Sequence, residues 1–241
     1  MVTYCLSINT YEGLVLCAVS FVEPDKLPSR SSMQRYIWPG NRFITVLSSG
    51  NQLTIDGVLN RIQQDLDKQT PINLLTAYSL DAVSDYIADI SVKYQHDLIK
   101  KHGTLQAYEA NFIVSGQIYN QKMETLLIYA EGNYIQESND SPFLQIGEIK
   151  FGKPILDRII NRHLNLNSAA HCALVSVDST ARSNPAIKIK TELLLYKNNS
   201  FNIGHHLLLV ENSDFISRMS AAWSEGITAA LNDLPRFEWE R

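Results

Sequence analysis

The sequence has little cysteine, little net charge and no long apolar run, and each scarcity excludes a class of protein. Its three cysteines, Cys5, Cys17 and Cys172, form no CxxC pair and no His/Cys metal spacing, which indicates buried thiols in a reducing compartment. Lys and Arg total 21 against 25 Asp and Glu, without a basic run, so nothing favours a nucleic-acid or membrane-surface partner.

Motifs for targeting, metals and cofactors are missing as well. The N-terminal segment lacks the continuous apolar block of a signal peptide, and no apolar run approaches the length that spans a bilayer, so we expect a cytoplasmic protein. There is no HExxH, GxSxG or phosphate-loop pattern. Adjacent His205 and His206 point to opposite faces of a predicted strand and cannot share one ion. We therefore expect no metal and no cofactor.

Hydrophobic periodicity divides the chain into strands and helices. Alternation of period two predicts strands, and apolar residues at spacings of three and four predict helices. The predicted strands are 2–8, 14–22, 34–38, 42–47, 111–119, 124–130, 134–136, 187–196 and 205–210. The predicted helices are 53–66, 80–103, 154–164, 168–181 and 214–231. Strand 2–8 should be half-buried, with Thr3 and Tyr4 on opposite faces.

The order of these elements indicates the fold class. Strands, two helices, strands, two helices, strands and a last helix follow one another without a linker long enough to separate domains. We expect one α+β domain over residues 1–241, built as a four-layer αββα sandwich with antiparallel sheets inside and helices outside. This is also the layout of N-terminal-nucleophile hydrolases.

Seven stretches carry a resemblance along nearly the whole chain. They are TYC at 3–5, EGLV at 12–15, SGN at 49–51, SGQI at 115–118, IYAEGN at 128–133, LQIGEIKFGKPILDR at 144–158 and CALVSVDSTARSN at 172–184. Together they resemble the Anbu family, the "ancestral beta subunit" group of bacterial proteasome homologues. The resemblance implies a proteasome-like fold, self-assembly into a ring or an open helical ring, and a threonine peptidase activity on a peptide or protein substrate.

The resemblance assigns the catalytic positions to particular residues. Thr3 takes the position of the nucleophile, and the general base would be its own α-amine, so Thr3 would have to be the N-terminal residue. Removal of the initiator methionine alone would leave Val2 first. Gly50 matches the glycine whose N–H faces the oxyanion, and it serves equally well as a turn glycine between a strand and a helix.

Three positions depart from the family's pattern. Val19 stands where the resemblance expects an aspartate, Phe21 where it expects an arginine, and Ser32 near the expected lysine. Because Val19 and Phe21 share one apolar strand face, we expect them to fill the former pocket. A lysine without its aspartate would be a partly buried charge without a partner, so the loss of one favours the loss of the other.

The C-terminal half holds a further polar group of ambiguous meaning. Asp178, Ser179 and Ser183 resemble the Asp/Ser group that supports the N-terminal residue, with Glu148 nearby. Asp178 would equally satisfy backbone donors in a tight turn.

Three functions follow from these residues. The leading hypothesis is a homo-oligomeric, catalytically defective subunit. The rival is an atypical N-terminal threonine amide hydrolase in which Arg35 or Asp178 supplies the site's electrostatics, and the third is a small-molecule binding module that uses the old pocket.

Overall fold

The computed structural model describes residues 3–22, 31–104, 107–183, 188–210 and 213–240. Ten strands lie within them: β1 Thr3–Asn9, β2 Gly13–Val22, β3 Met33–Trp38, β4 Arg42–Gly50, β5 Ala110–Ile118, β6 Glu124–Ile128, β7 Tyr134–Gln136, β8 Phe143–Gly147, β9 Lys188–Lys197 and β10 His205–Val210. The helices are α1 Gln52–Asp67, α2 Leu80–His102, α3 Lys153–Ile159, α4 Leu166–Arg182 and α5 Asp214–Asn232, followed by the short 3₁₀ helix η1 Glu238–Glu240.

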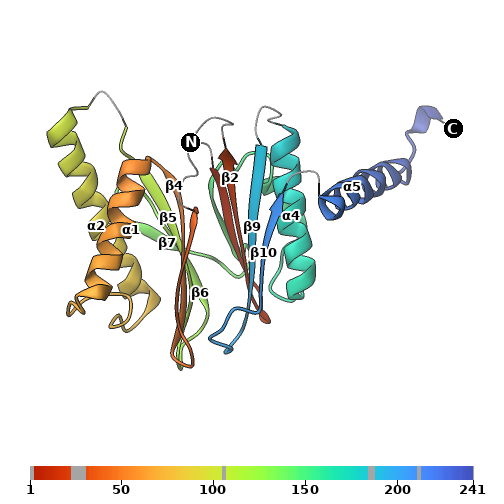
Figure 1. The fold of residues 1–241 in the computed structure, drawn as a ribbon. Helices are drawn as coiled ribbons and strands as arrows, with labels where there is room; N and C mark the ends of the chain where they lie inside the picture. Colours follow the sequence, from red (N-terminus) through yellow and green to blue (C-terminus); the bar gives the residue numbers. More distant parts are fainter. Residues whose placement is uncertain (1–2, 23–30, 105–106, 184–187, 211–212, 241) are drawn as a thin grey trace.

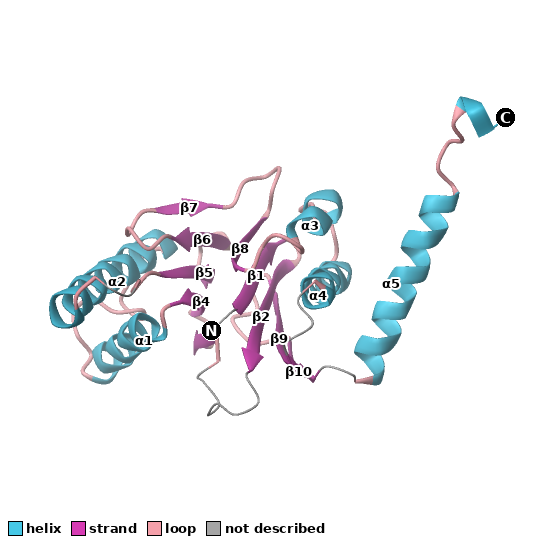
Figure 2. Cartoon of the chain, turned by 90° about the horizontal axis from the view of Figure 1, so that it is seen from above, coloured by secondary structure: helices cyan, strands magenta, loops and turns pink. Residues whose placement is uncertain are grey.

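The strands form two five-stranded antiparallel sheets that lie face to face (Figure 1). One sheet has the order β10-β9-β2-β1-β8 and the other β3-β4-β5-β6-β7. Helices α1 and α2 cover the outer face of the second sheet, and α3 and α4 cover the outer face of the first (Figures 1 and 2). The expected four-layer αββα sandwich is confirmed.

Three apolar clusters fill the spaces between these layers. Helix α1 contributes Ile55, Val58, Leu59 and Ile62 to the cluster against the second sheet, as its spacing predicts. Its start is set by Asn51, whose side-chain oxygen accepts hydrogen bonds from the Leu53 and Thr54 amides. The two helical spans 53–66 and 80–103 predicted from the sequence therefore match α1 and α2 to within a residue.

Strand β1 is buried on both faces, so the expectation of a half-buried strand is wrong. Tyr4, Leu6 and Ile8 pack toward α3 and α4, whereas Cys5 lies in the cluster between the two sheets. Both faces are covered because β1 lies inside its sheet, between β2 and β8, and each side of that sheet meets another layer.

One strand is new, and one predicted helix is shorter than expected. β8 was not predicted, because its sequence FLQIG is short and lacks a clear alternation. The helix predicted over 154–164 ends at Ile159, since Asn161 starts a turn in which its side-chain oxygen accepts the His163 amide at 3.0 Å. Val2 and Ile187, predicted at strand ends, lie outside the described residues.

Helix α5 extends away from the sandwich, and the C-terminal end of the chain lies far from the two sheets (Figure 2). Ser220 is the residue of this helix that is buried. Within the described part of the chain, no helix combines the length and the apolar character needed to cross a membrane.

Candidate functional site

Thr3 lies at the start of β1, where the two sheets approach each other. Its hydroxyl donates a hydrogen bond of 2.6 Å to the Ser49 hydroxyl on β4 of the facing sheet. Its carbonyl oxygen accepts the Glu148 amide at 2.9 Å, just after β8. The residue is 4% exposed. Thr3 is thus a strand residue whose hydroxyl joins the two sheets.

Two glycines pack closely around this position. Gly147 has a φ of +87°, and a Cβ there would lie 2.0 Å from the Thr3 carbonyl oxygen. Gly50 has a φ of +126°, and a Cβ would lie 2.4 Å from the Glu109 carbonyl oxygen. Position 50, between β4 and α1, therefore requires a glycine. Its neighbour Ser49 bonds the Thr3 hydroxyl, so Gly50 lies close to that hydroxyl.

The groups beside Thr3 between the sheets include an uncharged thiol and two uncharged hydroxyls, those of Cys5, Ser49 and Ser32. Cys5 is fully buried, its thiol lies 3.8 Å from the Ser48 carbonyl oxygen, and burial raises the pKa of that thiol to about 12. The Ser32 hydroxyl, also buried, lies within hydrogen-bonding reach of the thiol. At neutral pH this thiol is protonated, so it is a packing group and not a nucleophile.

The nearest predicted cation is already paired. The Arg35 guanidinium on β3 lies 3.3 Å from a carboxylate oxygen of Glu192 on β9, which also bonds the His206 ring at 2.8 Å. Sequence reasoning missed Glu192, the lone carboxylate of β9, which directly precedes the three leucines 193–195. Glu192 stands beside Ala18, which in turn stands beside Cys5, so this carboxylate reaches the space between the sheets from β9.

Val19 does not line the Thr3 site, which corrects the expectation of a filled pocket. Thr3 is paired with Ser20 across the β1–β2 ladder, and paired residues share a face. Val19 is paired with Tyr4 and packs with it in the cluster beneath α4. Phe21 belongs to β2 by its backbone, but its side chain lies outside the described residues.

Asp178, Ser179 and Ser183 form no hydrogen bond with Thr3 in the described part of the chain. Asp178 accepts the Ser220 hydroxyl at 2.8 Å and pairs with Arg182 at 3.1 Å, so it holds α5 against α4. It stands within helix α4, so the tight-turn alternative is wrong too. The Ser183 hydroxyl donates to the Ser179 carbonyl at 2.9 Å and closes the end of α4.

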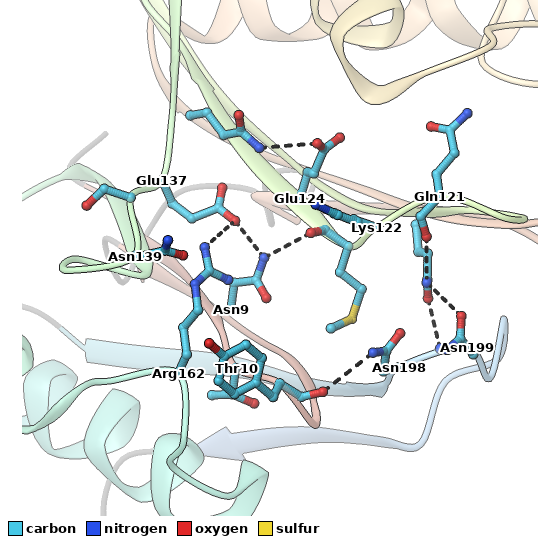
Figure 3. Close-up of a pocket in the computed structure, with 15 residues that line it drawn as sticks. Asn9, Thr10, Gln121, Lys122, Glu124, Glu137, Asn139, Arg162, Asn198 and Asn199 are labelled. Carbon is cyan, nitrogen blue, oxygen red and sulfur yellow. Dashed lines mark hydrogen bonds and ion pairs between the residues drawn. The ribbon is translucent and has the colours of Figure 1, made fainter.

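A polar pocket of about 810 Å³ opens at the other end of β1 (Figure 3). Seven side-chain amides line it: Asn9, Gln117, Gln121, Gln136, Asn139, Asn198 and Asn199. Thr10, Tyr11, Lys122, Met123, Glu124, Glu137, Ser138 and Arg162 complete the lining. Sequence reasoning missed this pocket, because its walls come from turns and strand ends that are far apart along the chain.

Two buried side chains, Asn9 and Glu137, and the partly buried Arg162 converge at one side of this pocket (Figure 3). Glu137 accepts the Asn9 amide at 2.6 Å, and its second oxygen accepts the Thr125 backbone amide at 2.8 Å. Burial raises the pKa of Glu137, opposed by these hydrogen bonds and by the Arg162 charge. Arg162 contributes one contact of 3.4 Å to Glu137, and its Nε has no hydrogen-bond partner among the described residues.

Comparison with known proteins identifies relatives by structure. No protein-family model and no curated protein matches the sequence. The structure described as "Helical Assembly of the Anbu Complex from Pseudomonas aeruginosa" is 30% identical, with 97% of this chain and 98% of that chain covered, at a TM-score of 0.88. An Anbu (Gly-1) mutant from Hyphomicrobium sp. strain MC1 is 29% identical, with coverage of 98% and 99% and a TM-score of 0.89. Anbu from Yersinia bercovieri is 26% identical, with coverage of 98% and 99% and a TM-score of 0.88.

Proposed function

Because the chain belongs to the Anbu family of proteasome-like proteins, we propose that it is a self-assembling subunit that has lost threonine peptidase chemistry. The proposal treats the whole of residues 1–241 as one proteasome-like domain whose partner is a second copy of itself. We also propose a cytoplasmic location. The three cysteines are free and buried, which supports a reducing compartment.

The surroundings of Thr3 carry the first half of this proposal. The N-terminal threonine mechanism uses a free α-amine as its base, so the chain would have to be cut between Val2 and Thr3 before Thr3 could act in this way. Its hydroxyl is buried and bonded to Ser49. Val19 stands at the position of the family's aspartate, and Ser32, near the position of its lysine, is neutral and buried. These features support a structural role for Thr3, the joining of two sheets.

The exposed apolar surface of α5 and β10 supports the second half. Leu231 on α5 is 64% exposed, and Leu208 on the edge strand β10 is 74% exposed. Beyond α5, the Phe237 and Trp239 rings stack 4.4 Å apart and are also exposed. Contiguous apolar surface and an uncovered strand edge are typical of interfaces between chains. The Pseudomonas aeruginosa relative is described as a helical assembly, which favours a second copy of this chain as the occupant.

Native mass spectrometry and light scattering on the full chain test the assembly. We expect an oligomer for the wild type and a monomer for Ile227→Glu/Leu231→Glu, since both replaced side chains are exposed on α5. Tyr78→Glu is the control, because Tyr78 is even more exposed than Ile227 and Leu231 but lies in the loop between α1 and α2. A monomeric wild type, or a double variant that still assembles, would contradict the proposed interface.

One observation favours the rival, a threonine amide hydrolase. The 2.6 Å hydrogen bond to Ser49 keeps the Thr3 hydroxyl next to Gly50, the position of the family's oxyanion glycine. Intact mass with N-terminal sequencing of the native protein separates the two hypotheses. A terminus at Met1 or Val2 supports the defective subunit. A terminus at Thr3, together with covalent labelling of Thr3 by a boronate or epoxyketone, supports the hydrolase.

A further inference from the structure

We propose that the polar pocket at the Asn9 end of β1 binds the free carboxylate end of a peptide, with Arg162 as the carboxylate partner. The site goes beyond the proposed function because it does not involve Thr3. Thr3 and Asn9 are six residue steps apart on an extended strand, a distance of about 20 Å at the usual rise per residue.

Arg162 is a cation whose hydrogen-bonding capacity is mostly unused. A guanidinium has five N–H donors, and within the described residues this one makes a single contact of 3.4 Å, to Glu137. The side chain is 16% exposed and lines the pocket, so its remaining donors are open to a group that binds there. The Nε atom is buried without a partner. Such a group gains most from an acceptor that binds two of its N–H groups at once, as a carboxylate does.

Glu137 does not fill that role. Its two oxygens are already engaged by the Asn9 side chain at 2.6 Å and the Thr125 backbone amide at 2.8 Å. These bonds hold the carboxyl group away from a close, two-point contact with Arg162, and its side chain is 1% exposed. The pair is therefore a fixed wall of the pocket in which Arg162 keeps unused N–H donors, and Lys122 adds a second cation without an ion pair in the described part of the chain.

The remaining lining suits peptide groups. Side-chain amides offer one donor and one acceptor in a plane, the same pattern as the backbone of a peptide. Part of this wall is held rigidly: Gln117 accepts the Tyr196 hydroxyl at 2.7 Å and donates to Asn199 at 2.8 Å. Asn139, in contrast, makes no hydrogen bond with any described residue and is free to meet a ligand.

The charge balance favours a carboxylate over a phosphate. Glu124 and Glu137 line the same pocket as Lys122 and Arg162, so a ligand with two negative charges would be repelled where a singly charged group is tolerated. Among the described residues no group of His, Cys, Asp and Glu has the arrangement of a metal site. The volume of about 810 Å³ is in the range of pockets that hold a drug-sized ligand, and a short peptide is of that size.

Calorimetry and fluorescence polarisation on the full chain test the site with a tripeptide library in two forms, free acid and C-terminal amide. We expect the free acids to bind and the amides to bind at least about tenfold more weakly, since loss of one member of a charged pair costs at least that much. Equal binding of both forms, or no binding of any peptide at millimolar concentration, would overturn the proposal. Single amino acids and succinate form a third arm, and binding of these alone would overturn the peptide assignment.

Binding measurements on variants test whether Arg162 is the partner of the peptide carboxylate. Arg162→Gln should weaken free-acid binding at least about tenfold and leave amide binding unchanged, whereas Arg158→Gln, an exposed arginine on α3, should change neither. If Arg162→Gln lowers the thermal midpoint, Lys122→Gln and Asn139→Ala provide the readout, because neither side chain makes a hydrogen bond within the described structure. Each should weaken binding about two- to fivefold. Wild-type affinity in both variants would place the peptide elsewhere.

Discussion

The two ends of β1 lie on the same strand face but have opposite chemistry. At one end the Thr3 hydroxyl bonds the uncharged hydroxyl of Ser49, and the protonated thiol of Cys5 lies on the same strand face. At the other end Asn9 bonds a buried carboxyl group, Glu137, beside an incompletely paired arginine. The first end is closed by the facing sheet, and the second opens into a pocket. Residues on one strand face can therefore lie in a closed contact between sheets at one end and in an open pocket at the other.

Between these ends, a third polar residue of β1 also bonds across the sheets. The Ser7 hydroxyl lies 2.8 Å from the Ser115 hydroxyl and 3.1 Å from the Thr125 hydroxyl. Polar bonds to the facing sheet therefore recur along this face of β1. Because a slip of one residue would turn Tyr4 and Leu6 toward the facing sheet, these bonds fix both the register and the spacing of the sandwich.

The largest expected effect is at the Thr3 end. Gly147→Ala should lower the free energy of unfolding by about 3 kcal/mol or more, since the new Cβ meets the Thr3 carbonyl oxygen at 2.0 Å in a left-handed conformation. Gly40→Ala is the control, with a φ of +73° and no atom within 4 Å of its Cβ, and should cost about 1 kcal/mol. Urea denaturation measures both. Equal losses of unfolding free energy would mean that the close packing of Gly147 on β8 against Thr3 adds nothing to stability.

The layers of the fold could be predicted from the sequence because each helix and most strands carry their own period. Helices α1 and α2 have apolar stripes and polar caps, at Asn51 and Ser79, that need no tertiary information. β8 could not be found in this way. Its five residues are a strand only because β1 lies beside them and pairs with them.

The candidate sites were harder to predict because they depend on register and on contacts between distant segments. Period two separates the faces of β2, but only the pairing of Thr3 with Ser20 shows that Val19 faces α4. The sequence left two roles open for Asp178, support of Thr3 or of a tight turn, and its partner is instead Ser220, on a helix whose position the sequence does not reveal. Charged contacts such as Glu137 with Arg162 carry no local signal at all.

The next effect tests the Asn9 end of the strand. Asn9→Ala should lower the free energy of unfolding by about 2 to 3 kcal/mol, because it removes the 2.6 Å donor to a buried carboxyl group. Asn198→Ala is the control, since its side chain makes one exposed contact of 3.5 Å. Guanidinium denaturation at neutral pH measures the difference. A loss no larger than that of the control would show that the contacts with Arg162 and Thr125 are enough to stabilise the buried carboxyl group of Glu137.

A smaller effect is expected where two neutral hydroxyls meet. Thr3→Val should lower the free energy of unfolding by about 1 kcal/mol, the usual worth of one hydrogen bond, because the shape of the side chain is kept. A double-mutant cycle with Ser49→Ala isolates the pair. Coupling near zero would mean that this bond does not join the sheets, whereas Thr3→Ser should retain the coupling.

The smallest expected effect is a dependence of the unfolding free energy on pH that arises at the Asn9 end of β1. Because burial raises the pKa of Glu137 above its ordinary value of 4.5, the folded chain holds this proton more tightly than the unfolded chain does. The resulting stability is fully present below pH 4.5 and is lost as the pH rises through the folded-state pKa. Glu137→Gln should remove that loss, so the difference in unfolding free energy between wild type and variant should change between pH 4 and pH 8. Glu131→Gln, at an exposed position, is the control. Parallel profiles for wild type and Glu137→Gln would mean that folding does not change the pKa of Glu137.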